Sequence, residues 1–216
     1  MLTSTATPYT GFTSDDFAVF QLPGLDERMT AIQNQIQPKF RSIGGRLAEE
    51  LTLLSGREMH LHIARHARRK VNPPKDTWLS ICSNKRGYKA HPHFQLGLFD
   101  DHLFLWLALI YEVPNKKNIA SAYLNRLDDV TEAVPDSFVV SQDHMKKEAV
   151  AAGDMSEEDW RTALVRFRDV GKAELLIGRH LAADDEVLRD EDELATFALS
   201  TYETLLPLYR IATDVQ

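Results

Sequence analysis

Cysteine is nearly absent from this chain of 216 residues, in which Cys82 is the single one. One cysteine cannot form a disulfide within the chain, which suits a reducing compartment such as the cytoplasm. Because Cys82 lies between Ile81 and Ser83 in an expected strand, we interpret it as a buried, unreactive thiol and not as a nucleophile.

Long apolar runs are also absent. The most apolar one, Leu103–Tyr111, is far shorter than the ~20 residues that a membrane helix needs. The first twelve residues have neither the cationic start nor the apolar segment of a signal peptide. We therefore expect a cytoplasmic protein without a membrane partner.

Positive charge is scarce, with 25 Lys and Arg against 32 Asp and Glu and a net charge of −7. Bulk charge of this sign repels nucleic acids and anionic lipids. The sequence has no phosphate-binding glycine loop, no G-x-S-x-G, no H-E-x-x-H and no C-x-x-C motif. We assign no cofactor, and the sequence does not identify a reaction.

The length fits one domain over residues 1–216, with residues 1–12 as a loose N-terminal tail. Apolar residues make up 44% of the chain, which is enough for a core without disulfides or structural metals. We find no internal repeat and no low-complexity segment, so nothing in the sequence divides the chain.

Apolar spacing predicts the order of the elements. Residues 25–36 show helical spacing, Pro38 is expected to kink or break the helix, and a second helix continues to Ser55-Gly56. In that second helix, Gly44-Gly45 predicts the close approach of another element. Strands are expected at 59–64, 77–83, 89–99, 102–112, 137–140 and 172–181, a loop with a helical turn at 141–154, and helices at 119–134, 157–170 and from about 186 or 191 to 212.

This order favours an α+β fold with a mixed, largely antiparallel sheet. Short connections between the strands in residues 77–112 predict a central β-meander. We expect helices from the N-terminal and C-terminal parts of the chain to cover the sheet.

One stretch, residues 57–93, departs from the acidic average. It has nine Lys or Arg and two acids, a formal charge of +7, and it contains five of the eight histidines. Arginine matches a phosphate or carboxylate with two parallel N–H donors, and lysine adds a point charge. The stretch therefore predicts an anion site or, alternatively, solvated charge that pairs with acidic helices.

The candidate ligand residues flank the proline-rich loop at 71–74 and the turn at 84–87. Tyr88, like Trp78, could stack on a base, although packing in the core is the alternative for both. The candidate ligand-binding residues are His66, Arg68, Arg69, Lys85, Arg86, Tyr88 and His93.

Two histidine pairs, His60/His62 and His91/His93, are spaced so that each projects from one face of a strand. They could meet at a zinc ion if the two strands were neighbours. The surrounding arginines would repel a cation, so we assign no metal. We interpret these histidines as solvated or hydrogen-bonded or, alternatively, as anion-binding.

Several blocks of sequence carry a resemblance to a known family. They are FAVFQLPGLDERMTAIQNQIQP, HARRKVNPPKDTW, NKRGYKAHPHFQLGLFD, HLFLWLALIYE and LLPLY. In these blocks, and over nearly its whole length, the chain resembles the YktB-like family of Bacillus and its relatives, catalogued as a domain of unknown function. The resemblance implies a single α+β domain in the bacterial cytoplasm. It brings no catalytic residue, substrate or cofactor.

Three hypotheses follow from the residues. The first is a binding module for a phosphate-bearing ligand, either a nucleotide or RNA. The second is a phosphoesterase or nuclease that uses His66 or His93 as its acid–base group. The third is an interaction module whose basic stretch meets an acidic protein partner or the chain's own acidic segment at 184–193. The sequence does not identify the ligand or the oligomeric state.

Overall fold

A seven-stranded sheet organises the protein, whose computed structural model describes residues 11–215. The strand order is β1-β2-β3-β4-β7-β5-β6, and every pairing in it is antiparallel. The strands are β1 (His60–Ile63), β2 (Thr77–Cys82), β3 (His93–Leu98), β4 (His102–Leu109), β5 (Val139–Ser141), β6 (Val150–Ala151) and β7 (Leu175–Ala182). The predicted α+β class and the central meander, which is β2-β3-β4, are therefore confirmed.

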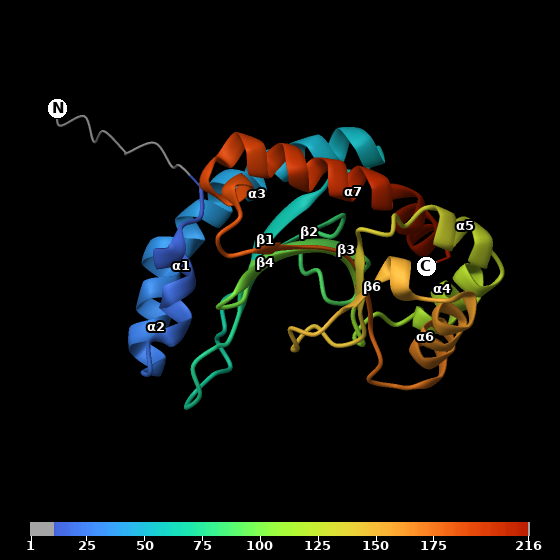
Figure 1. The fold of residues 1–216 in the computed structure, drawn as a ribbon, viewed down its shortest axis with the longest axis horizontal. Coiled ribbons are helices and arrows are strands. Elements are labelled where there is room, and N and C mark those ends of the chain that lie inside the picture. The colour runs from blue at the N-terminus through green and yellow to red at the C-terminus, as the bar shows by residue number, and fades with distance from the viewer. Residues whose placement is uncertain (1–10, 216) are drawn as a thin grey trace.

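Alternation along the strands gives the sheet two different faces. On one face Leu79, Leu96 and Leu105 join the main hydrophobic core. The helices α3 (Gln37–Ser55) and α7 (Glu191–Asp214) lie across this face, as Figure 1 shows. These helices come from the two ends of the chain, as the sequence predicted.

Shorter helices stand at both ends of the sheet (Figure 1). Near the N-terminus are α1 (Ser14–Ala18), a 3-10 turn (Val19–Gln21), α2 (Leu25–Ala31) and a π-helical segment (Ile32–Ile36). At the other end are α4 (Lys116–Leu124), α5 (Leu127–Glu132) and α6 (Glu157–Asp169). Two further 3-10 turns cover Ala152–Asp154 and Glu186–Arg189. None of the described helices is long and apolar enough to cross a membrane.

The predicted kink or break around Pro38 corresponds to the π-helical segment Ile32–Ile36, which separates α2 from α3. Pro38 lies in the first turn of α3, where a missing N–H removes no helical hydrogen bond. The chain enters this turn through the π-helical segment, so the helical path continues from α2 to α3. Gly44 does permit a close approach, because an added Cβ would lie 2.6 Å from a methyl group of Leu61 in β1.

The region after β4 also differs from the prediction. The helix expected at 119–134 is divided at Asn125-Arg126, where Arg126 leaves the helical conformation with φ −131°. Residues 150–151, expected to be helical or loop, form the edge strand β6 and pair with β5. Of the expected loose tail, residues 1–10 lie outside the described residues, whereas Phe12 is fully buried and its N–H donates to the carbonyl of Leu188.

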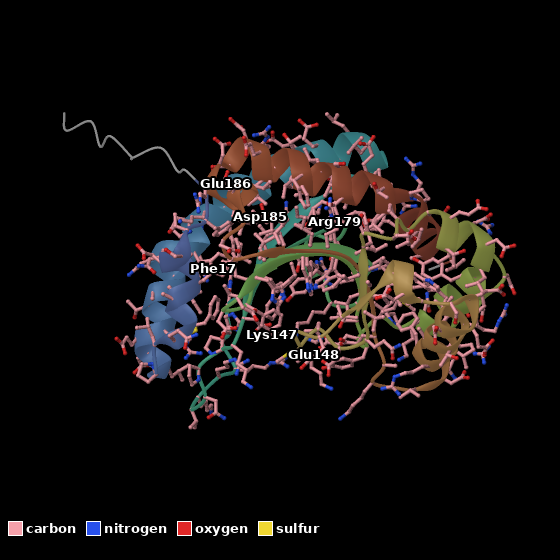
Figure 2. The ribbon with its side chains drawn as sticks, in the orientation of Figure 1. Phe17, Lys147, Glu148, Arg179, Asp185 and Glu186 are labelled. Atoms are coloured by element: carbon pink, nitrogen blue, oxygen red, sulfur yellow. The ribbon has the colours of Figure 1, made fainter. Side chains whose placement is uncertain are left out.

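The second face of the sheet has no helical layer over it among the described residues, and we call it the open face. Phe104 and Trp106 form a small apolar cluster there. Figure 2 shows Lys147 and Glu148 on this side of the sheet, whereas Arg179 lies on the helix-covered side. The loops 64–76, 83–92 and 142–149 run beneath the open face (Figure 1).

Candidate functional site

Trp78 of β2 is the point on the open face where the three loops meet. Strand alternation turns its side chain away from the helix-covered core. Gly97, its partner in β3, leaves room for it, since a Cβ there would lie 2.7 Å from the Cβ of Trp78. The His66 ring lies 5.4 Å from the Trp78 ring, the His144 ring lies 6.4 Å away, and the indole N–H donates to the Tyr88 hydroxyl at 3.0 Å.

His66 is held in an unusual backbone conformation. Its φ of 50° makes it the one non-glycine residue with positive φ in the range 11–215. Its Nε2 lies 3.2 Å from the Thr77 hydroxyl, and burial together with the nearby charge of Arg69 lowers the pKa of His66 to about 4. Strained backbone of this kind concentrates at functional sites.

A groove of about 810 Å³ lies beside Tyr88, and we call it the basic groove. The side chain of Asn84 shapes the turn at its edge by accepting hydrogen bonds from the N–H groups of Arg86 and Gly87. The cationic residues that line the groove are Arg65, Lys85, Arg86 and Lys89, and His62, Tyr88 and Glu112 also line it.

Most of these cations have no acidic partner. Lys89 lies 3.5 Å from Glu112, but over residues 11–215 no carboxylate lies within 4.0 Å of the charged ends of Arg65, Lys85 or Arg86. Unpaired charge in a groove is available to a ligand, whereas charge in an ion pair is not. The groove therefore suits an anion.

Arg68 and Arg69 lie outside the basic groove, on the loop at 64–76. They are close enough to act electrostatically on other residues of the open face. Glu112 raises the pKa of Tyr111 and burial raises that of Asp76, and the charges of Arg68 and Arg69, respectively, oppose these increases. In the described part of the chain neither arginine forms an ion pair. The structure thus groups Lys85, Arg86 and Tyr88, and places both arginines on a neighbouring loop.

His93 lies underneath this surface and is fully buried. Its Nδ1 lies 2.7 Å from the His91 carbonyl and its Nε2 lies 2.8 Å from the side-chain nitrogen of Gln95, so both ring nitrogens have partners. Burial lowers the pKa of His93 to about 3. The Tyr88 ring covers it at 4.9 Å, which makes His93 a support for Tyr88. The strand β2 separates β1 with its His60/His62 pair from β3.

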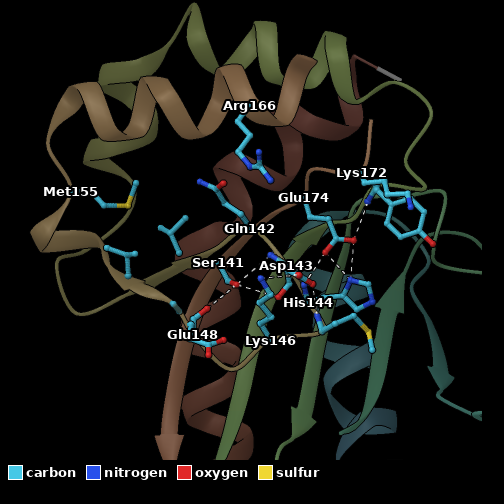
Figure 3. Close-up of a pocket in the computed structure, with 15 residues that line it drawn as sticks. Ser141, Gln142, Asp143, His144, Lys146, Glu148, Met155, Arg166, Lys172 and Glu174 are labelled. Carbon is cyan, nitrogen blue, oxygen red and sulfur yellow. Dashed lines mark hydrogen bonds and ion pairs between the residues drawn. The ribbon is translucent and has the colours of Figure 1, made fainter. Parts of the chain in front are cut away.

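A second pocket, which sequence reasoning missed, lies on the other side of Trp78. It has a volume of about 630 Å³ and extends from β5 and the loop at 142–149 to α6 and the start of β7. Figure 3 shows His144 and Glu174 side by side in it. The His144 Nδ1 lies 2.7 Å from the Glu174 carboxylate, which also accepts from the backbone N–H groups of His144 and Tyr111. We call it the His144 pocket.

Burial of His144 favours its neutral form, but the hydrogen bond and charge of Glu174 and the charges of Asp76 and Asp143 outweigh this and raise the pKa of His144. A histidine oriented through Nδ1 by a buried carboxylate is an arrangement that acid–base catalysis can use. Asp143, His144 and Glu174 also bring one potential metal-ligand atom each within 4.8 Å of one another. We assign no metal there, because Nδ1 already bonds Glu174 and an Asp143 oxygen accepts from the Met145 N–H.

Asp76 is the second feature that sequence reasoning missed. Its side chain is only 2% exposed, and neither carboxylate oxygen has a hydrogen-bond partner in the described structure. Burial raises the pKa of Asp76 to about 6, against the opposing effects of His144 and Arg69. An unpaired buried carboxylate is costly, so its presence beside Trp78 makes the open face the candidate site.

The sequence held weak signals for these residues. Glu174 is a carboxylate directly before the apolar strand β7, and Asp76 directly precedes Thr77, the first residue of β2. A carboxylate that is buried at such a position is costly unless it has a hydrogen-bonding or charged partner, so it indicates either such a partner or a functional role. His144 lies in a segment interpreted as a polar loop, and nothing in its local sequence indicated that it would meet Glu174 thirty residues later.

The pairing of His144 with Glu174 is expected to control the protonation of His144. Replacing Glu174 by glutamine should lower the pKa of His144 below its ordinary value of about 6.5, because burial then acts with less opposition. The titration of the imidazole proton shifts by NMR measures this pKa. The matched change Glu112→Gln, at a carboxylate that contacts Lys89 and Tyr111 instead, should leave it unchanged. An unaltered His144 titration in Glu174→Gln would contradict the assignment.

Comparison with known proteins gives a family and no activity. A model of the family described as a domain of unknown function, DUF1054, matches residues 12–209. A UPF0637 protein of Oceanobacillus iheyensis is 57% identical over 204 residues, which are 94% of this chain and 97% of that protein. Similar UPF0637 proteins occur in Shouchella clausii, 55% identical over 95% of this chain and 96% of the relative, and in Listeria welshimeri, 47% identical over 94% and 98%. The chain therefore belongs to the DUF1054 family of uncharacterised bacterial proteins, in agreement with the YktB-like resemblance.

Proposed function

We propose that the protein is a cytoplasmic binding module that holds a phosphate-bearing ligand, a nucleotide or RNA, in the basic groove. The observation that carries this proposal is the set of cations in the groove without acidic partners, Arg65, Lys85 and Arg86. Two guanidinium groups and an ammonium group around one groove can satisfy several phosphate oxygens.

The competing explanation, pairing of the basic stretch with the chain's own acidic segment, finds little support. In that segment Asp192 pairs with Arg46, Glu191 accepts from Ser42, and Glu186 pairs with Arg189. Asp185 and Asp190 cap the turn and helix that follow them. Arg57 does pair with Asp214, at the end of α7, but the groove cations remain available. An acidic protein partner remains the alternative occupant of the same surface.

Removing charge from the groove tests the proposal. The double variant Lys85→Gln/Arg86→Gln should weaken the binding of UTP by about 10-fold or more, because two charge-assisted hydrogen-bond donors are lost. Isothermal titration calorimetry at two salt concentrations measures the effect, and wild-type binding should weaken as salt increases. The control Lys117→Gln/Arg126→Gln removes the same charge from exposed positions in and after α4. Equal loss in both double variants would indicate bulk charge and count against the groove.

A phosphoesterase or nuclease is the second candidate, and one observation favours it. His144 is oriented by a buried carboxylate and lines a pocket, whereas His93 is buried with both nitrogens occupied and His66 faces Thr77. Cleavage of a labelled RNA that disappears in His144→Asn while binding persists would establish this activity. Cleavage that depends on His66 instead would assign the acid–base role to His66, one of the two histidines expected from the sequence.

A further inference from the structure

Tyr111 occupies the junction between the two pockets of the open face. It lines the His144 pocket, and the next residue, Glu112, lines the basic groove. Its backbone N–H donates to Glu174 and its hydroxyl donates to Glu112 at 3.3 Å. Although both ends are held, 45% of its surface is exposed. A fixed, exposed aromatic ring is a platform on which a nucleobase can stack.

The His144 pocket has its own available cations. In the described structure, no carboxylate lies within 4.0 Å of the charged ends of Arg166 and Lys172. Figure 3 shows them on the side formed by α6 and the start of β7, away from Glu148. Among the acids of this pocket, Glu174 is engaged by His144, and Asp143 lies 3.7 Å from Lys146. The side with Arg166, Lys172 and His144 can therefore accept an anion.

The two pockets together form an alternating surface. Cations of the basic groove lie on one side of Tyr111, and cations of the His144 pocket lie on the other. A mononucleotide presents phosphates at one end of a single base and can occupy only one of these places. Single-stranded nucleic acid repeats phosphate and base, and so matches the whole surface.

We propose that the ligand is a single-stranded RNA segment of several nucleotides, which runs from the basic groove past Tyr111 into the His144 pocket. In this arrangement Lys85 and Arg86 contact one phosphate, Tyr111 stacks on a base, and Arg166 and Lys172 contact a later phosphate. This inference rests on the proposed function of the basic groove and adds to it the class of ligand and a second subsite.

The first test is the dependence of affinity on length. Fluorescence anisotropy with oligouridylates of two, four, eight and twelve nucleotides should show affinity rising by about 10-fold or more from the shortest to the longer chains, because the second contact becomes intramolecular. UTP measured by calorimetry gives the affinity of a single subsite, and weaker UTP binding in Lys85→Gln/Arg86→Gln assigns that subsite to the basic groove. Affinity that stays at the level of UTP for every length would overturn the second subsite.

The second test removes the subsite and the stacking platform separately. Arg166→Gln/Lys172→Gln should abolish the gain with length and reduce the slope of log affinity against log salt by about 0.7, the value for one lost phosphate contact on a single strand. Tyr111→Leu should weaken the eight-nucleotide chain by about 5-fold or more, with little effect on inorganic polyphosphate, which has no base to stack. The control is again Lys117→Gln/Arg126→Gln.

The outcomes distinguish this inference from the function on which it rests. If UTP binds and Lys85→Gln/Arg86→Gln weakens it, but neither Arg166→Gln/Lys172→Gln nor Tyr111→Leu changes binding of the long chains, the inference alone is wrong. If neither UTP nor the twelve-nucleotide chain binds, the proposed function fails and the inference fails with it. Polyphosphate binding that falls equally in Tyr111→Leu would refute the stacking role.

Discussion

Replacing Gly178 by alanine is expected to destabilise the fold by about 3 kcal/mol or more. Gly178 lies in β7 opposite Trp106 of β4 and Val139 of β5, so both of its neighbours are strands. A Cβ at this position would lie 1.8 Å from the carbonyl oxygen of Leu105, which is backbone and cannot rotate away. The pairing of β4 with β7 would have to shift, and β5 and β6 are attached to the sheet only through β7.

The matched control is Gly45→Ala. Gly45 is in the interior of α3, its φ is not positive, and an added Cβ would meet no atom within 4 Å. Alanine should therefore stabilise the helix there by roughly 0.5–1 kcal/mol. Urea denaturation followed by circular dichroism measures both changes. If Gly178→Ala lost less than about 1 kcal/mol, the packing of β4 against β7 would be looser than the structure shows.

The folding pattern could be predicted where local periodicity decides it. Residues 77–109 were predicted as three adjacent antiparallel strands because short apolar segments joined by short turns leave few other arrangements. The errors occurred where tertiary contacts override local signals. An interruption of the helix around Pro38 was predicted, but its form was not: a π-helical segment precedes α3 and places Pro38 in the first turn of that helix. The short strand β6 has no signal of its own and exists because β5 lies beside it.

The candidate site was only partly predictable, for a different physical reason. Composition locates charge, so the basic stretch led directly to Lys85, Arg86 and Tyr88, which the structure places around one groove. Composition does not report which side chains meet across the fold. His144 lies on a loop before α6, and Glu174 lies after α6, directly before β7. The significance of Asp76 comes from the absence of hydrogen-bond partners for its carboxylate in the described structure.

Asp76→Asn is expected to stabilise the protein at pH 7, the opposite of what most substitutions of buried residues do. The Asp76 carboxyl has a pKa of about 6 in the folded protein against 3.8 as its ordinary value. Its ionised form therefore lowers the free energy of unfolding by about 3 kcal/mol above pH 6. An amide in the same place carries no charge but still lacks partners, so the net gain should be roughly 1–3 kcal/mol.

The gain in stability that we expect from Asp76→Asn depends on pH. Between pH 3.8 and about 6 the folded protein binds the Asp76 proton more tightly than the unfolded chain does, so the contribution of Asp76 to stability falls as the pH rises through this window. The advantage of Asp76→Asn should be smallest near pH 4 and constant above about pH 6.5. Urea midpoints at several pH values measure it. Asp16→Asn is the control, since Asp16 is equally buried but accepts from Lys39 and the Thr13 N–H, and its loss should destabilise the protein.

Asp76→Asn also tests whether the charge of Asp76 acts on His144. The charge of Asp76 is one of the causes that raise the pKa of His144, so Asp76→Asn should lower that pKa while it raises the urea midpoint. A residue that costs stability and whose charge favours the protonated form of a neighbouring histidine is typical of a site under functional constraint. NMR titration of His144 in Asp76→Asn gives the measurement. A more stable variant with an unchanged His144 pKa would mean that the two groups are not coupled, and Asp76 would lose its place in the site.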